Sequence, residues 1–129
     1  MRAYQLQTRA SRVGFDWKEI RPVWNKVREE IRELEHAIGE GQPRQIQAEF
    51  GDIFFALVNM ARFLKLDPEE SLRKANQRFV DRFHYMEKRA GKSQKTLSNM
   101  TLSEMDRLWE EAKSAEQKAE KKAIRRRPR

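Results

Sequence analysis

The sequence predicts an all-α fold with about five helices around a central antiparallel helical hairpin, completed to a four-helix bundle by dimerisation. Apolar residues recur at the spacing of amphipathic helices, strand-like alternation is nearly absent, and glycine and proline fall at a few separated points. At 129 residues the chain has room for one modest core. The absence of cysteine excludes disulfides and thiolate metal sites. No apolar stretch is long enough to cross a bilayer, so we expect a cytoplasmic protein with no membrane partner.

A glycine and a proline delimit the first predicted helix and the connector after it. A helix over residues 3–13 ends at Gly14, since glycine is often found just past a helix C-terminus. Residues 15–21 form a connector, because Pro22 disfavours helical backbone at the residue before it. Pro22 itself suits a first helical turn, so the second helix is predicted over residues 22–38.

Glycine and proline also predict a tight hairpin at the centre of the chain. Gly39 and Gly41 end the second helix, and Pro43 opens a third helix that reaches about Leu64. Because the connection is so short, the two helices are expected to run antiparallel and to lie against each other.

Two capping signals predict the remaining helices. Asp67 is an N-cap and Pro68 suits the first helical position, so a fourth helix begins there and runs to near Gly91. After a polar loop, Thr101 and Glu104 form a capping box that opens a fifth helix.

The net charge of +8 is concentrated at the C-terminus. Residues 113–129 hold eight Lys and Arg against two Glu, a balance of +6, which leaves +2 for residues 1–112. We therefore predict one all-α domain over residues 1–112 and a basic helix end or tail, partly disordered, over residues 113–129. Because such a tail can bind nucleic acid, a small basic nucleic-acid-binding or adaptor protein without catalytic activity is the alternative interpretation.

The most informative pattern is a repeat of acidic and apolar positions in the two hairpin helices. When Val-Arg-Glu-Glu-Ile-Arg-Glu-Leu of the second helix is laid over Ile-Gln-Ala-Glu-Phe-Gly-Asp-Ile of the third, Glu30 and Glu33 fall on Glu49 and Asp52. The apolar positions coincide as well, as two stripes with helical spacing: Val27, Ile31, Leu34 and Ile38 in the second helix, and Ile46, Phe50, Ile53 and Leu57 in the third.

The two acidic pairs converge if these stripes face each other in an antiparallel hairpin. At about 100° per residue each pair is displaced to the same side of its stripe, and the pairs differ in height by roughly 1.5 Å. Four carboxylates drawn together repel one another unless a cation is present, and oxygen ligands suit Mg²⁺ or Mn²⁺. Two interpretations stay open: a divalent metal site, or a solvated helix face neutralised by nearby Lys and Arg. We call Glu30, Glu33, Glu49 and Asp52 the acidic cluster.

Other polar and aromatic residues are candidates only through their place on a helix. Arg78 and Arg82 lie one turn apart on the fourth helix, a spacing compatible with phosphate binding or with simple solvation. The pattern alone assigns a packing role to Trp17, Trp24 and Trp109.

Acidic motifs and several longer segments match a known family. Glu29, Glu30 and Glu33 spell EExxE, and Glu49 and Asp52 spell ExxD in the next helix. The likeness continues in Arg-Val-Gly-Phe-Asp-Trp before the hairpin, in Leu-Asp-Pro-Glu-Glu-Ser-Leu and Arg-Phe-Val-Asp-Arg-Phe after it, and in Met-Asp-Arg-Leu-Trp-Glu-Glu-Ala-Lys near the end. Over roughly residues 6–113 the chain thus resembles the MazG family of nucleotide pyrophosphohydrolases.

The resemblance implies a dimeric all-α enzyme that hydrolyses a nucleoside triphosphate to monophosphate and pyrophosphate, as in nucleotide-pool control or house-cleaning. The family's Mg²⁺ ligands correspond to the acidic cluster, and a glutamate of that cluster, Glu30 or Glu33, is expected to accept the proton of the attacking water. Arg78 stands where lysine is common in the family, which preserves charge but changes geometry. The residues expected to bind substrate are Lys26, Arg78 and Arg82 at the phosphates and Trp109 at the base.

The hairpin also carries more apolar surface than two helices can cover. Phe54, Phe55, Val58 and Met60 flank the stripe of the third helix. Four helices from two chains bury such surface, so we expect a homodimer or a higher homo-oligomer.

Overall fold

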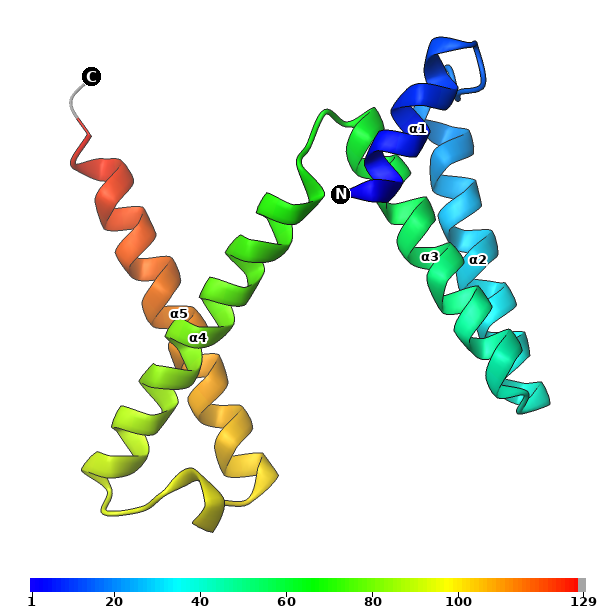
Figure 1. Ribbon diagram of the computed structural model, residues 1–129. Helices are drawn as coiled ribbons and strands as arrows, with labels where there is room; N and C mark the ends of the chain where they lie inside the picture. Colours follow the sequence, from blue (N-terminus) through cyan, green and yellow to red (C-terminus); the bar gives the residue numbers. More distant parts are fainter. Residues whose placement is uncertain (128–129) are drawn as a thin grey trace. The chain divides into compact units, whose positions relative to one another are not determined.

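Every regular element in the computed structural model, which describes residues 1–127, is helical. The predicted all-α class and its five helices are confirmed. No helix in this range has a stretch that is both long and apolar enough to span a membrane. The elements in order are α1 (Arg2–Arg12), α2 (Ile20–Glu40), α3 (Pro43–Phe63), α4 (Pro68–Lys92), the 3-10 helix η1 (Leu97–Asn99) and α5 (Leu102–Arg125) (Figure 1).

The limits of α2 differ from the predicted ones at both ends. The helix begins two residues before Pro22, which is tolerated because the N–H groups of a first turn have no partner within the helix. Gly39 stays helical, so the expectation that it ends the helix is wrong. Gly41 ends α2 with φ of 71°, a left-handed conformation that glycine adopts without steric cost, and its N–H donates to the carbonyls of Ala37 and Ile38.

Both predicted capping signals are present. Asp67 Oδ1 accepts hydrogen bonds from the backbone N–H groups of Glu69 and Glu70, at 3.0 and 3.3 Å. At the start of α5, Thr101 Oγ1 accepts from the Glu104 N–H at 3.1 Å, and the Glu104 side chain accepts from the Thr101 N–H at 3.4 Å. These bonds satisfy first-turn N–H groups that a helix otherwise leaves unpaired.

The chain divides into two compact units, Met1–Leu72 and the residues from Arg73 onward. In the first unit α2 and α3 lie side by side in opposite directions, and α1 packs on α3 (Figure 1). Its core is made by Val23 and Val27 of α2 with Ala56 and Met60 of α3. In the second unit α5 includes residues 113–125 of the basic segment. Pro128 and Arg129, at the end of the predicted tail, lie outside the described residues.

The hairpin does not bury the complete apolar stripes that the sequence pattern predicted. Val27 is buried, but four other stripe residues are 42–58% exposed: Ile31, Ile38, Phe50 and Leu57. Small residues take their place, since Ala37 of α2 and Ala56 of α3 are buried. The predicted flank is also divided, because Val58 and Met60 are buried within the unit, whereas Phe54 and Phe55 are exposed.

Candidate functional site

Three acidic side chains of α2 and α3 meet in the first unit. Glu30 lies on α2, Glu49 and Asp52 lie one turn apart on α3, and one carboxylate oxygen of each lies within 4.8 Å of the other two. Glu30 is buried, Glu49 is partly buried and Asp52 is exposed. The carboxylate triad formed by these three residues therefore extends from the core of the hairpin to its surface.

Two oxygens of this triad are buried without a hydrogen-bond partner. They are Oε2 of Glu30 and Oε2 of Glu49. A buried carboxylate oxygen with no partner is unfavourable, and like charges this close add repulsion. A divalent cation removes both penalties, and carboxylates are the ligands that hard cations prefer. The donor set and its unpartnered oxygens thus fit a divalent metal ion.

Lys26 compensates part of the negative charge. Its Nζ lies 2.9 Å from Oε1 of Glu30 and 3.5 Å from Oε1 of Glu29. The hydrogen bond to Glu30, together with the nearby charges of Glu30 and Glu29, raises the pKa of Lys26 above its ordinary value. One lysine charge set against three carboxylates leaves the triad negative.

Glu33, the fourth acid of the cluster, lies outside the triad. Its side chain is exposed on α2. Its pKa is raised chiefly by the charge of Glu30, with smaller contributions from burial and from Glu49. Glu33 is therefore close enough to the triad to feel its charge while remaining accessible to water.

The remaining predicted site residues belong to the second unit. Arg82 donates from Nε to Glu116 Oε2 at 2.8 Å, and its guanidinium carbon lies 5.2 Å from the ring centroid of Trp109. Trp109 is partly buried and also contacts Phe79, with 5.6 Å between ring centroids. Arg78 is exposed on α4. The structure thus brings Arg82 and Trp109 together, within a unit separate from the acidic cluster.

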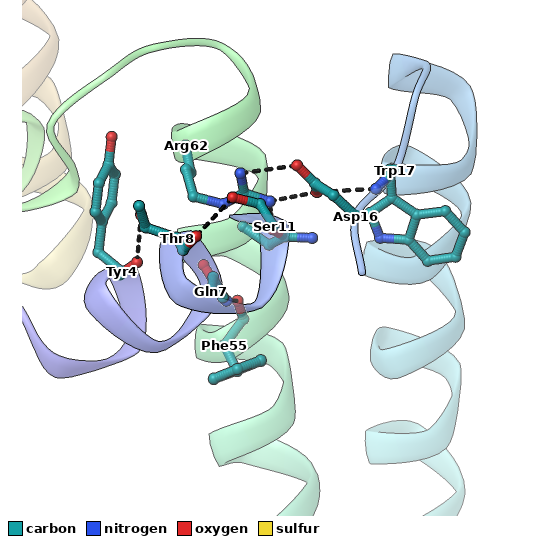
Figure 2. A network of polar contacts seen from close by, with 9 residues as sticks. Tyr4, Gln7, Thr8, Ser11, Asp16, Trp17, Phe55 and Arg62 are labelled. Atoms are coloured by element: carbon teal, nitrogen blue, oxygen red, sulfur yellow. Dashed lines mark hydrogen bonds and ion pairs between the residues drawn. The ribbon is translucent and has the colours of Figure 1, made fainter. Parts of the chain in front are cut away.

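A pocket of about 620 Å³ adjoins the triad, and sequence reasoning assigned no role to most of its wall. Arg62 of α3 contributes to this wall. Its guanidinium donates to both carboxylate oxygens of Asp16, with Nη1 to Oδ2 at 3.0 Å (Figure 2). It also donates to Asn59 Oδ1 at 2.8 Å. The only sequence signal was the Arg-Val-Gly-Phe-Asp-Trp segment. Trp17, assigned to packing, is 44% exposed and lines this pocket.

Comparison with known proteins decides the family. Residues 21–88 match the family model described as the MazG nucleotide pyrophosphohydrolase domain. The chain belongs to the MazG family. The matched range contains the whole acidic cluster together with Lys26, Arg78 and Arg82, so the resemblance seen in the motifs is confirmed.

Curated relatives extend the match beyond that range. The chain is 43% identical over 115 residues to the nucleoside triphosphate pyrophosphohydrolase/pyrophosphatase MazG of Thermotoga maritima, covering 89% of the chain and 44% of the relative. It is 36% identical over 118 residues to the nucleoside triphosphate pyrophosphohydrolase of Escherichia coli K12, covering 90% and 45%. It is 50% identical over 74 residues to the uncharacterized protein YabN of Bacillus subtilis, covering 57% and 15%. The chain thus spans less than half the length of these relatives.

Proposed function

We propose that the chain hydrolyses nucleoside triphosphates to nucleoside monophosphate and pyrophosphate, with Mg²⁺, or Mn²⁺ in its place, bound by Glu30, Glu49 and Asp52. The observation that carries the proposal is the carboxylate triad with its two buried, unpartnered oxygens. Membership of the MazG family supports it, as do the pyrophosphohydrolase names of the relatives in T. maritima and E. coli.

The triad residues would hold the metal, while other residues of the same unit act on water and phosphate. When bound, the ion neutralises phosphate charge and lowers the pKa of water. Glu33 is the better candidate for the general base, because Glu30 is buried, paired with Lys26 and part of the ligand set. Glu33 is exposed to water beside the triad, where its carboxylate can accept the proton of the attacking water. Lys26 lies beside the triad, where its charge attracts a phosphate oxygen.

Further substrate contacts are proposed for the second unit. Arg78 and Arg82 bind phosphate oxygens, which their fork of N–H donors suits. Arg82 already pairs with the carboxylate of Glu116, so phosphate binding exchanges one anionic partner for another. Trp109 offers an aromatic face on which a base can stack.

A homodimer, or a higher homo-oligomer, is proposed as the working state. The stripe residues left exposed on the hairpin are joined by Phe54, which is 57% exposed and packs its ring 5.2 Å from that of Phe50. Exposed apolar residues in such number are typical of interfaces, and pairing two hairpins forms a four-helix bundle.

The function is tested with a panel of nucleoside and deoxynucleoside triphosphates in the presence of Mg²⁺, scoring pyrophosphate against orthophosphate. We expect pyrophosphate and monophosphate in equal amounts, no product with a chelator, and unchanged turnover after deletion of residues 126–129, the arginine-rich end that follows α5. Release of orthophosphate alone would contradict the proposal. Tail-dependent, salt-sensitive binding of a polynucleotide without any turnover would favour the nucleic-acid-binding alternative instead.

A further inference from the structure

The pocket of the first unit opens directly beside the metal-binding carboxylates. Glu30 and Asp52 belong both to the triad and to the wall of the pocket. Its volume of about 620 Å³ falls within the range of small-molecule sites. Phosphates bound at the triad would therefore place the nucleoside attached to them at this pocket. The apolar part of the wall is aromatic to a large extent and includes Leu6, Phe15, Trp17 and Phe55.

Besides Glu30, the wall contains a second buried polar residue, Gln7 of α1. It is only 7% exposed, and its Nε2 donates to the backbone carbonyl of Phe55 at 2.8 Å (Figure 2). Its Oε1 is buried and has no hydrogen-bond partner. A side-chain amide that is more than nine-tenths buried and leaves its carbonyl oxygen unpaired is unfavourable, so a ligand donor is expected there.

The orientation of this amide is fixed by its partner. A flip of the Gln7 side chain would set its oxygen against the carbonyl oxygen of Phe55, and two acceptors cannot form a hydrogen bond. Oε1 is therefore the atom presented away from Phe55. It can receive a hydrogen but cannot donate one.

Another part of the wall is held in place by ion pairing. Asp16 accepts from Arg62 and from the backbone N–H of Trp17, the latter at 2.8 Å, so the connector that carries Phe15 and Trp17 is tied to α3 (Figure 2). Arg62 also leaves Nε buried without a partner. Apart from the triad, the lining thus offers Gln7 Oε1 as an unpaired acceptor and Arg62 Nε as an unpaired donor, together with aromatic side chains. This combination matches the polar edge and flat faces of a nucleobase.

We propose that this pocket receives the nucleobase of the substrate and that Gln7 is a specificity-determining residue, its Oε1 accepting a hydrogen bond from an N–H of the base. The inference rests on the proposed nucleotide hydrolysis. Every natural base carries an N–H on its edge. A ribose hydroxyl is the other donor that a nucleotide contains, so the test separates the two. Gln7 would contact the edge of the base, whereas a stacked tryptophan contacts its flat face. The role proposed for Trp109 is therefore independent of this one.

The experiment compares the wild-type chain with Gln7→Met and with Gln5→Met, an exposed glutamine on the same helix. The kcat/KM with Mg²⁺ is measured for ATP, CTP, GTP and UTP, each beside an analogue whose edge N–H is deleted or methylated, and for the deoxynucleotides. We expect the wild type and Gln5→Met to prefer the natural base of at least one pair by about tenfold, and Gln7→Met to lose that preference. An unchanged ratio in Gln7→Met, or a change that follows only the 2′-hydroxyl, would overturn the assignment.

Binding measurements keep this test independent of turnover. Each natural nucleotide and its base-modified analogue are titrated calorimetrically as α,β-methylene triphosphates, which resist hydrolysis between the α and β phosphates. If no triphosphate is hydrolysed but base-dependent binding disappears in Gln7→Met, the proposed hydrolysis fails and the pocket assignment stands. If hydrolysis occurs and the wild type never distinguishes a base from its analogue, the pocket assignment fails and hydrolysis stands.

A second variant guards against misfolding of Gln7→Met. Phe15 lines the pocket but is 81% exposed, so Phe15→Ala removes wall surface without opening the core. We expect KM for nucleotides to rise severalfold with an unchanged melting temperature. An unchanged KM would contradict the pocket as the base site.

Discussion

Lys26 Nζ lies 2.9 Å from Oε1 of Glu30, the most buried acid of the hairpin. Replacing Lys26 with Met leaves the carboxylate without its cation, at a cost between that of an exposed and that of a buried ion pair, about 1–2 kcal/mol. We expect a lower melting temperature in the presence of a chelator and recovery when Mg²⁺ is added, because an ion that binds only the folded state stabilises it. Lys18→Met, which alters an exposed lysine of the same unit, is the control. Equal losses with and without Mg²⁺ would contradict the prediction.

Substitutions in the acidic cluster are expected to have two different effects on the enzyme. Glu49→Gln and Asp52→Asn each remove a metal-ligand charge, so turnover and Mn²⁺ binding are lost while the helical circular dichroism is kept, and stability can rise as repulsion falls. Glu33→Gln keeps the triad and lowers kcat by about 10²–10⁴, the range of a general base. Calorimetric Mn²⁺ titration beside the activity assay separates the two classes. Full activity in both triad variants would refute the metal assignment, and Glu35→Gln serves as the exposed control.

Trp109 is partly buried against Phe79 and Arg82. A packing role and a base-stacking role predict different effects of its removal. Loss of stacking corresponds to about 1–3 kcal/mol of binding, whereas loss of a core tryptophan lowers stability by about 3–5 kcal/mol. We expect Trp109→Ala to raise KM about tenfold for several nucleotides with little change in melting temperature. A sharply lower melting temperature with a normal KM would make Trp109 a packing residue.

The pH dependence of stability should report the ion pair between Asp16 and Arg62. The hydrogen bond from Arg62 is the main reason why the pKa of Asp16 lies below its ordinary value. Stability from a carboxyl with a lowered folded pKa is fully present above its unfolded value, near pH 4, and is lost as the pH falls through the folded pKa. Melting curves of wild type and Asp16→Asn from about pH 6 to about pH 2 should therefore converge at the acid end. A constant difference would exclude the ion pair as its cause.

Dimerisation is tested at the exposed aromatic pair of α3. Sedimentation of the wild type at micromolar concentration should give a mass above that of the 15.5 kDa monomer. Phe54→Glu should lower the measured mass towards 15.5 kDa, because it introduces charge into the proposed interface. Leu102→Glu alters an exposed apolar residue of the second unit and is the control. A stable, active wild-type monomer would refute the proposed assembly.

Helix limits were predictable where one residue determines the local backbone. Gly41, Pro43, the Asp67–Pro68 pair and the Thr101–Glu104 box each act within one turn, and the structure has a helix end at each. Gly39 was misassigned because a single glycine inside a helix costs only about 1 kcal/mol, which tertiary packing can offset.

The facing surfaces of the hairpin were less predictable than its limits. The periodic pattern predicted that the large apolar residues would be buried. In the structure Ala37 and Ala56 are buried, whereas Ile31 and Phe50 are exposed. The acids of the triad were found because their spacing repeats on both helices. The pocket beside them was not found, since Gln7 and Arg62 reach it only through contacts between distant segments, which no local pattern encodes.

These distant contacts also bear on the order in which the first unit folds and opens. Gln7 bonds to a residue 48 positions away and Asp16 to one 46 positions away, whereas the two-residue connection after Glu40 brings α2 and α3 together locally. Loop-closure entropy grows with such separations, so we expect α1 and its connector to dock onto a hairpin that has already formed. The same segment can detach by local unfolding while the hairpin stays intact. Amide hydrogen exchange is therefore expected to be faster in α1 than in α2 and α3. The carboxylates of the hairpin would then keep their positions while α1 and its connector, which form part of the pocket wall, open and close.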